Sequence, residues 1–389
     1  MDRSDAAAAV GRNLMWFKRS GVMLPVDGSW GVAERLVQKA GNEALEQITN
    51  TFTAYSDRGD FLVVEQRRAD CNFEAAWLFL LASRIFPVSD AYTIGSNILQ
   101  YLYCRSGLLE RSAGEKTVYG SWNWSHTMRQ PALWFDDNAW CIFLQLKIGE
   151  LFPEFEARYN MRSWALILAE EILRGAKENP GNMWSGNLAL PHWGSLVCMA
   201  LAEAYRYDPK VEYAEYCSDY YRNIAPPNGS EHAYALLGAL NCRRVFGGEL
   251  FAQAVKNHSE ALLNAADPVT GNIPSEHCEA PGGEGVADLI YTMNWARLSL
   301  REAGLAGDER CAALAEKIGV FLFNIQDTSA DANCRGCWRG MYDMTGKCYG
   351  GGNRHEGGAG SIYTGWTNAP LAVTFALEAD RNRSIFAGK

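Results

Sequence analysis

Two adjacent carboxylates lie between large aromatic side chains in one segment, Trp134-Phe135-Asp136-Asp137-Asn138-Ala139-Trp140. Apolar residues at helical spacing follow at once, so the carboxylates fall at a helix N-terminus, where aspartate caps free N–H groups and the helix dipole favours negative charge. Tryptophan beside a carboxyl group also suits a sugar site, with the ring against the apolar sugar face and the acid at the glycosidic oxygen. The segment alone fits a structural role, in capping and core packing, as well as it fits a sugar site, so the arrangement of the rest of the chain must decide between them.

Polar and aromatic side chains also precede other apolar helical segments, and these are the remaining candidates. Asp137 and Asp70 are the expected catalytic pair, with Glu284 and Glu356 as reserves. The candidates for contacting a substrate are Asp136, Trp134, Trp140, His192, Trp193, His232, Tyr291, Arg339, Arg354, Tyr363 and Trp366. Such side chains on one rim have the composition of a carbohydrate cleft. Each also has a structural interpretation, since aspartate is a good N-cap and a lone histidine is more often a packing residue.

The elements that must position these residues are about twelve helices, which apolar periodicity predicts. The links that leave the even-numbered helices are short, and those that enter them are mostly long. Short links join antiparallel neighbours, so the long loops should emerge together at the N-termini of the even-numbered helices. The predicted helices are 30–57, 72–86, 88–105, 137–151, 153–176, 191–206, 210–224, 230–246, 248–266, 285–303, 308–325 and 361–379.

Six helical hairpins with long loops on one face predict an all-α fold, an (α/α)6 toroid whose inner helices are the even-numbered ones. Strand-like segments in the long loops predict small β-ribbons over that face, at 61–65, 117–122 and 337–343. An irregular stack of helix pairs is the structural alternative. No linker divides the chain, so we expect one domain over 30–389 behind an N-terminal extension, 1–29, with a frayed start.

The amino-acid composition limits which binding partners and which cellular compartment we expect for this protein. The net charge of −9 argues against nucleic acid or an anionic membrane as partner. No apolar run approaches the roughly 20 residues that span a bilayer. Residues 1–13 lack the apolar core of a signal peptide, and most of the 11 cysteines lie in apolar helical patterns as small hydrophobes. We therefore expect a cytoplasmic protein whose partner is an oligosaccharide substrate.

The glycine-rich and cysteine-containing loops give weak signals for other ligands. Neither 282–285 nor 350–352 has the context of a phosphate-binding loop, and Asp136-Asp137 lacks the third acid of a magnesium–diphosphate motif. Cys334, Cys337, Cys348 and His355 could ligate zinc, but their spacing is loose. We expect no metal and no cofactor.

The arrangement resembles the (α/α)6-barrel six-hairpin glycosidases, and most of all the unsaturated uronyl hydrolases and related β-glucuronidases. Phe135-Asp136-Asp137-Asn138 is similar to their signature at the fourth helix, with Asp137 in the catalytic place. Arg68-Ala69-Asp70-Cys71-Asn72 is similar to the entrance that carries their second aspartate. The segment 336–370 resembles the tail of uncharacterised six-hairpin proteins. Two features depart from the pattern: the residues after Asn138, and the missing His-Asp pair at the first site.

The resemblance implies a glycoside hydrolase that removes end units from uronic-acid-containing oligosaccharides by carboxylate acid/base catalysis. In the unsaturated-uronyl relatives an aspartate protonates the sugar double bond and water adds. A uronate needs a basic partner, and the candidates are Arg67, Arg68, Arg335, Arg339 and Arg354. The alternatives are a polysaccharide lyase with Tyr291, Tyr363 or His192 as base, a sugar epimerase, and a non-catalytic carbohydrate-binding scaffold.

Overall fold

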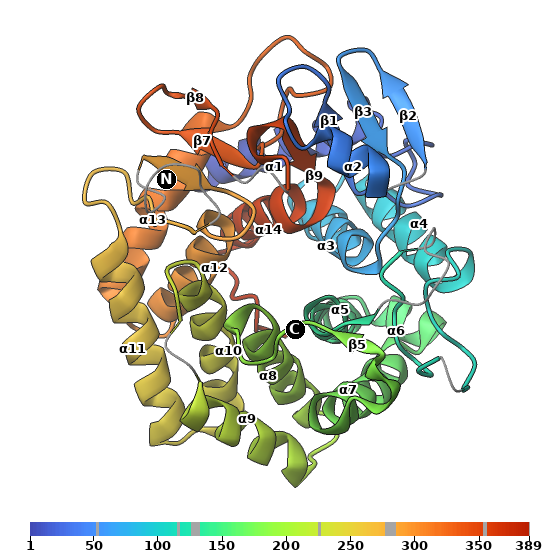
Figure 1. The fold of residues 1–389 in the computed structure, drawn as a ribbon, viewed down its shortest axis with the longest axis vertical. Helices are drawn as coiled ribbons and strands as arrows, with labels where there is room; N and C mark the ends of the chain where they lie inside the picture. Colours follow the sequence, from blue (N-terminus) through green and yellow to red (C-terminus); the bar gives the residue numbers. More distant parts are fainter. Residues whose placement is uncertain are drawn as a thin grey trace.

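The computed structural model describes residues 1–51, 54–114, 117–125, 133–224, 227–276, 285–352 and 356–388. Twelve of its helices form two concentric rings, which Figure 1 shows end-on. The inner ring is α3 (Ala69–Ile85), α5 (Phe135–Leu151), α8 (Pro191–Tyr205), α10 (Glu231–Phe246), α12 (Met293–Leu305) and α14 (Ala369–Ala379). The outer ring is α1 (Arg3–Arg19), α4 (Ala91–Cys104), α7 (Met161–Glu178), α9 (Val211–Asn223), α11 (Glu249–Ala265) and α13 (Glu309–Ile325). The predicted (α/α)6 toroid is confirmed.

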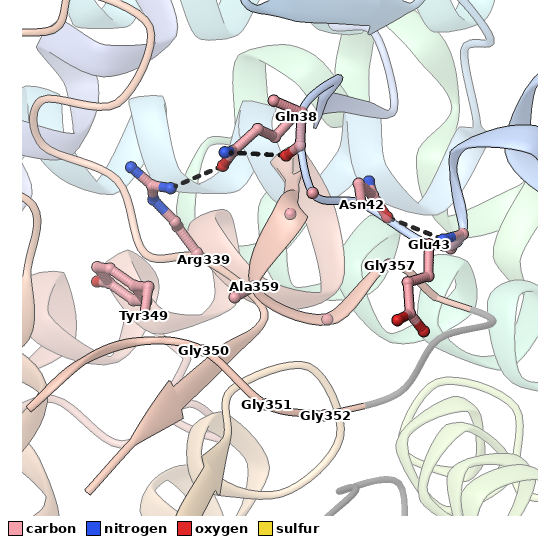
Figure 2. A pocket seen from close by; sticks show the side chains of 15 residues that line it. Gln38, Asn42, Glu43, Arg339, Tyr349, Gly350, Gly351, Gly352, Gly357 and Ala359 are labelled. Atoms are coloured by element: carbon pink, nitrogen blue, oxygen red, sulfur yellow. Dashed lines mark hydrogen bonds between the residues drawn. The ribbon is translucent and has the colours of Figure 1, made fainter. Parts of the chain in front are cut away.

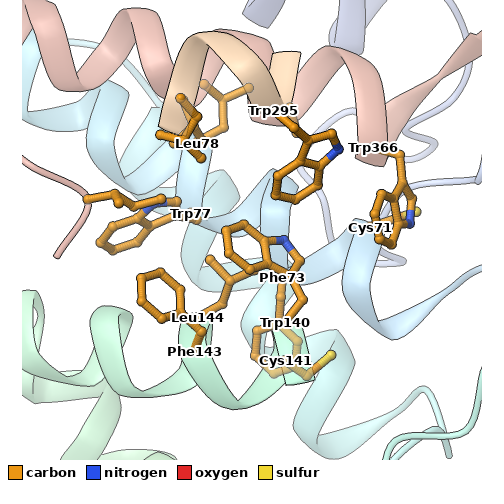
Figure 3. Packing of buried hydrophobic residues seen from close by; sticks show 14 of the residues in the cluster. Cys71, Phe73, Trp77, Leu78, Trp140, Cys141, Phe143, Leu144, Trp295 and Trp366 are labelled. Carbon is orange, nitrogen blue, oxygen red and sulfur yellow. The ribbon is translucent and has the colours of Figure 1, made fainter. Parts of the chain in front are cut away.

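The two rings differ in how much of each helix is buried. In α5 every residue except Glu150 is buried, so this helix has no solvent face. The outer helix α7 buries only one stripe, with Met161, Ala165 and Leu168 at helical spacing. The core between inner helices is aromatic: Trp140 stacks on Phe143 at 5.3 Å and meets Trp295 edge-on at 5.2 Å (Figure 3). The more apolar helices are therefore the inner ones, as their sequences predicted.

The N-terminal quarter differs from the prediction. The prediction of one helix over 30–57 was wrong. This part of the chain contains β1 (Arg35–Gln38), α2 (Leu45–Thr51) and β2 (Tyr55–Arg58). The missing outer helix is α1, which lies in the segment expected to be a frayed extension. Its alanine-rich sequence favours helix, Asp2 caps it by accepting from the Asp5 N–H, and its apolar side packs on α14 and α3.

Small sheets cover the end of the toroid where the inner helices begin. The largest has the antiparallel order β2–β3–β1–β9, with β3 at Phe61–Val64 and β9 at Ser361–Tyr363. A second sheet joins β6 (Val286–Asp288), β7 (Met341–Asp343) and β8 (Cys348–Tyr349), and a parallel pair joins β4 (Leu133–Trp134) to β5 (Trp184–Ser185). Two predicted helices therefore begin later than expected, α12 at Met293 and α14 at Ala369, because strands occupy their first residues. The predicted 153–176 helix is divided into α6 (Pro153–Tyr159) and α7 at Asn160, whose φ is +53°.

The strand-like segments were predicted with mixed success. Segment 61–65 is confirmed by β3, and the end of 337–343 by β7. Segment 117–122 forms only isolated bridges within its described part, such as Leu109 to Trp122. None of the helices in the described ranges combines the length and apolarity that a membrane crossing needs.

Candidate active site

Arg68 brings the two predicted catalytic aspartates together. It is the last extended residue before α3, with φ −106° and ψ 148°, and Asp70 lies in the first turn behind it. Its Nη2 contacts Asp70 Oδ2 at 2.7 Å and Asp137 Oδ1, at the start of α5, at 2.9 Å. Its Nη1 contacts Glu34 Oε1 at 3.3 Å. Asp70 and Asp137 therefore converge on one guanidinium nitrogen at the predicted rim.

Asp137 has the electrostatic environment of a proton donor. Burial raises its pKa well above the ordinary value, Arg68 lowers it, and the nearby charges of Asp70 and Asp136 raise it again. Only 8% of its side chain is exposed, so the burial effect dominates. Asp137 thus retains its proton to a higher pH than a solvated aspartate does.

Trp366 holds Asp70, the other carboxylate of this pair, in place. Its indole Nε1 donates to Asp70 Oδ2 at 2.5 Å, and its backbone N–H donates to Glu74 Oε2 at 2.9 Å. It does this with φ at +52°, which a bulky side chain rarely adopts and which marks a functional or packing constraint. Trp140 completes the set by donating from Nε1 to Glu74 Oε1 at 2.9 Å. Glu74 therefore ties α3 to α5 and to the turn before α14.

Glu74 is a buried acid that the sequence reasoning did not select. The available signal was a glutamate inside the otherwise apolar segment of α3. Burial raises the pKa of Glu74 to about 8, with Asp70 adding to the effect and the N–H donors of Trp366 and Trp140 opposing it. Its position behind Asp70 and Trp366 makes it a support of the site rather than part of its surface.

This raised pKa predicts a measurable pH dependence of stability. The folded pKa of Glu74 exceeds its unfolded value of 4.5, so the folded state binds the extra proton and loses stability as pH rises from 4.5 to about 8. In Glu74→Gln, the free energy of unfolding from urea titrations should fall less steeply with pH, by up to about 1.4 kcal/mol per pH unit. Equal slopes in the two proteins would show that Glu74 is ionised throughout.

His192 lies in an aromatic stack beside Asp136. Its ring stacks on Tyr234 at 4.7 Å and on Trp193 at 4.7 Å. Its Nε2 is 2.9 Å from Asp136 Oδ2, a charge contact whose geometry is not that of an aligned hydrogen bond. Burial lowers the pKa of His192, but Asp136 and Glu231 outweigh it, and the net shift is upward. The Asp136–His192 pair is a second acidic and basic grouping next to Asp137.

One basic residue of the candidate site, Arg35, was not selected from the sequence. Arg35, on β1, donates to Tyr363 and to the Glu356 backbone oxygen at 3.1 Å, and its Nη1 is 3.7 Å from Glu356 Oε2. Glu356 also accepts a hydrogen bond from Tyr363. A cavity of 150 Å³, which we call the cleft, opens here, with walls that include Glu34, Arg35, Arg68, Trp124, Glu356 and Tyr363. Asp70 and Asp137 are not among the residues that line it, and Arg68 is the residue that contacts both carboxylates from its wall.

Other predicted residues are placed differently. Tyr291 lies beside His192 at 5.8 Å between ring centres, and Trp134 packs near Trp124 at 6.4 Å. His232 turns to the outer helix α11, where its Nδ1 is 3.1 Å from that of His258, and so the structure does not bring it to the cleft. Arg339 lines a different cavity. Glu284 and Arg354 lie outside the described residues.

The described cysteines that could ligate zinc do not form a cluster. Cys334 and Cys337 are buried, and Cys348 is exposed on β8. The Cys334 thiol faces Arg339, whose Nη2 is 3.3 Å away. His355 lies outside the described residues. Within the ranges that the structure describes, no three histidine, cysteine, aspartate or glutamate side chains form a metal-binding cluster.

Known structures share this architecture, although no family model and no curated protein matches the sequence. The cellobiose 2-epimerase from Spirochaeta thermophila DSM 6192 gives a TM-score of 0.61 at 15% identity, over 97% of this chain and 96% of that one. A variant of the unsaturated glucuronyl hydrolase UGL with dGlcA-Glc-Rha-Glc gives 0.58 at 13% identity, over 97% of both chains. An inactive variant of the α-1,6-mannanase GH76A of Salegentibacter sp. HEL1_6 with α-1,6-mannotriose gives 0.53 at 11% identity, over 96% and 98%. The chain has the six-hairpin glycosidase fold, as its sequence predicted.

Proposed function

We propose that this protein is an exo-acting glycoside hydrolase with Asp137 as its acid/base and Asp70 as the partner carboxylate. The observation that carries the proposal is the shared contact of both carboxylates with Arg68 Nη2 at the mouth of the inner ring. Glycosidases need one carboxyl group that is protonated and a second that is ionised. Asp70 accepts from Arg68 and Trp366, and its charge helps to keep the proton on Asp137.

In this mechanism the protonated Asp137 donates to the sugar, either at the glycosidic oxygen or at the double bond of an unsaturated uronyl unit. The ionised Asp137 then removes a proton from the attacking water. The cavity of 150 Å³ is smaller than the roughly 300–1,000 Å³ of typical ligand pockets, which suits one terminal sugar unit rather than the middle of a chain. Activity against uronide aryl-glycosides and lyase-generated oligosaccharides, measured beside Asp137→Asn, tests the proposal.

A lyase that uses Tyr291 or Tyr363 as its base is the weaker alternative on chemical grounds. It requires a tyrosine or histidine that removes a proton from the sugar. Burial raises the pKa of Tyr363 and of Tyr291 well above the ordinary value, and the nearby Glu356 raises each further, so neither is a good base near neutral pH. An ultraviolet assay separates these chemistries, because a lyase raises the absorbance of its substrate, unsaturated-uronyl hydrolysis lowers it, and a binding scaffold does neither.

An epimerase or isomerase is the second candidate, and His192 is the observation that favours it. This histidine is held by aromatic rings beside Asp136, where it could move a proton on a sugar carbon. Two of the proteins with similar structures are a cellobiose 2-epimerase and a D-mannose isomerase. Incubation with cellobiose or D-mannose, followed by chromatography, would show a new sugar of the same mass if this candidate holds.

We extend the proposal to a uronic-acid substrate, because Arg35 and Arg68 both line the cavity. Of the arginines selected from the sequence, Arg68 reaches the cleft, whereas Arg67 turns to Glu65 at 2.7 Å. Arg68 is engaged by three carboxylates. Arg35 also pairs with carboxylates, with Glu34 at 3.1 Å and with Glu356 at 3.7 Å. We propose Arg35 as the partner of a sugar carboxylate because its long contact with Glu356 can be exchanged for one with the substrate, and burial of such a carboxylate without a partner would cost several kcal/mol.

The charge of the substrate gives a direct prediction. Wild type should prefer a uronide over the matching neutral glycoside in kcat/KM, and Arg35→Ala should reduce that preference by roughly 2–3 kcal/mol, the scale of a hydrogen bond to a charged group. Arg222→Ala is the matched control, since Arg222 is exposed on the outer helix α9 and pairs with Asp219. A wild-type preference for the neutral glycoside would reject the uronate and leave a neutral-sugar exoglycosidase.

A further inference from the structure

A second cavity lies outside the catalytic cleft, in the loops around β1 and β9. Its volume is 340 Å³, more than twice that of the cleft, and none of the residues that the structure describes lines both. Figure 2 shows Gln38, Arg339 and Tyr349 toward one end and Asn42 and Glu43 toward the other, with glycine loops between them. The cavity is therefore long enough to engage a ligand at two places.

Both ends carry hydrogen-bond donors that the protein does not use. Arg339 donates from Nη1 to Gln38 Oε1 at 3.2 Å, and its Nη2 is 3.4 Å from Asp327 Oδ2. Asn42 accepts from the Ala44 N–H at 3.1 Å. Arg339 Nε and Asn42 Nδ2 are buried and have no hydrogen-bond partner among the described residues. A buried donor without a partner is unfavourable, so a ligand whose acceptors meet these donors, after a rotation of the two side chains toward the cavity, is stabilised.

The walls between these ends are mostly main chain. Seven of the fifteen lining residues are glycines and three are alanines, so a ligand can approach backbone N–H and C=O groups closely. Backbone offers donors and acceptors in equal numbers, which matches hydroxyl groups better than a phosphate, since a phosphate needs donors alone. The charges agree, because Asp327 and Glu43 stand against Arg339, which is the one arginine among the described lining residues.

The cavity is separate from the cleft but shares its framework. Arg35 and Gln38 lie three residues apart on β1, and side chains at an odd spacing point to opposite faces of a sheet. Arg35 lines the cleft, and Gln38 lines the second cavity. Gly357, in the second cavity, directly follows Glu356, in the cleft. From this chemistry we infer a second saccharide site, which binds a neutral sugar on the far side of the β1–β9 pair from the catalytic cleft.

Binding measurements test this inference without any need for turnover. Isothermal titration of the full-length protein with cellobiose and with D-mannose should show a neutral-sugar site that Asn42→Ala and Arg339→Gln each weaken at least tenfold. His192→Ala, a variant at the candidate active site beside Asp136, should leave that site intact, and Asn257→Ala, on the outer helix α11, is the matched surface control. The site should bind neither D-glucuronate nor inorganic phosphate more tightly than the neutral sugars.

The result can overturn the inference in two ways. Neutral-sugar affinity that is equal in wild type, Asn42→Ala and Arg339→Gln would show that the cavity is not a saccharide site, as would the absence of any such binding. Tighter binding of glucuronate or phosphate, lost in Arg339→Gln, would assign the cavity to an anion instead. If Arg339→Gln fails to fold in a thermal melt, Asn42→Ala decides alone, because its hydrogen bond to Ala44 is local. An inactive enzyme would reject the proposed function but leave this test unchanged.

Discussion

Replacing Asp137 by asparagine should lower turnover by at least about 10²-fold while the protein remains folded, the usual scale for the loss of a general acid or base. Asparagine has nearly the same side-chain size as aspartate but carries no acidic proton that it could donate to the substrate. It should also cost little stability, because it removes one of two carboxylates that share Arg68 Nη2. The measurement is kcat on the best substrate of the glycoside screen, with a thermal melt of each protein.

The pH profile of the same enzyme provides the second half of this test. Because the pKa of Asp137 is raised in the folded protein, the active protonated form persists above the range of ordinary aspartates and is lost as pH rises through that folded value. Asp219→Asn is a matched control, since Asp219 is exposed on α9 and pairs only with Arg222 among the described contacts. Near-normal turnover in folded Asp137→Asn would assign the acid to another group.

The largest stability loss is expected from Arg68→Met. Arg68 contacts Glu34, Asp70 and Asp137, and all three are buried. Removal of one partner from a buried ionic group leaves uncompensated charge and typically costs 3–5 kcal/mol. The free energy of unfolding, from urea titration at neutral pH, should fall by this amount. Arg222→Met, whose pair with Asp219 is exposed, should change it by less than about 1 kcal/mol.

A double variant distinguishes charge from packing. If repulsion between the carboxylates causes the loss, adding Asp137→Asn to Arg68→Met should recover part of the stability, and the two effects should be non-additive by about 0.5–3 kcal/mol. The loss should also shrink at low pH, where the carboxylates take up protons. Additive effects, or a loss independent of pH, would mean that Arg68 acts through its packing on Trp124 and Trp366 instead.

The toroid was predictable because its signals are local. Apolar periodicity and the alternation of short and long links fix which helices are neighbours and which ends carry the loops. The same logic placed Asp70 and Asp137 at the starts of α3 and α5, where the structure has them. It failed at 30–57, because short apolar runs such as that of β1 do not distinguish strand from helix. The pairing of β1 with β9, more than 300 residues away, cannot be recognised from the residues around either strand.

The fold and the two aspartates at the starts of the inner helices were therefore predictable, since both depend on residues close together in the chain. The surroundings of those aspartates were not, because they come from contacts between distant segments. Arg68 reaches Asp137 across 69 positions, Trp366 reaches Asp70 across 296, and Arg35 enters the cleft through the antiparallel β1–β9 pair. Burial and charge then set the pKa of Asp137, and these depend on the sum of all neighbours, which no spacing along the chain encodes.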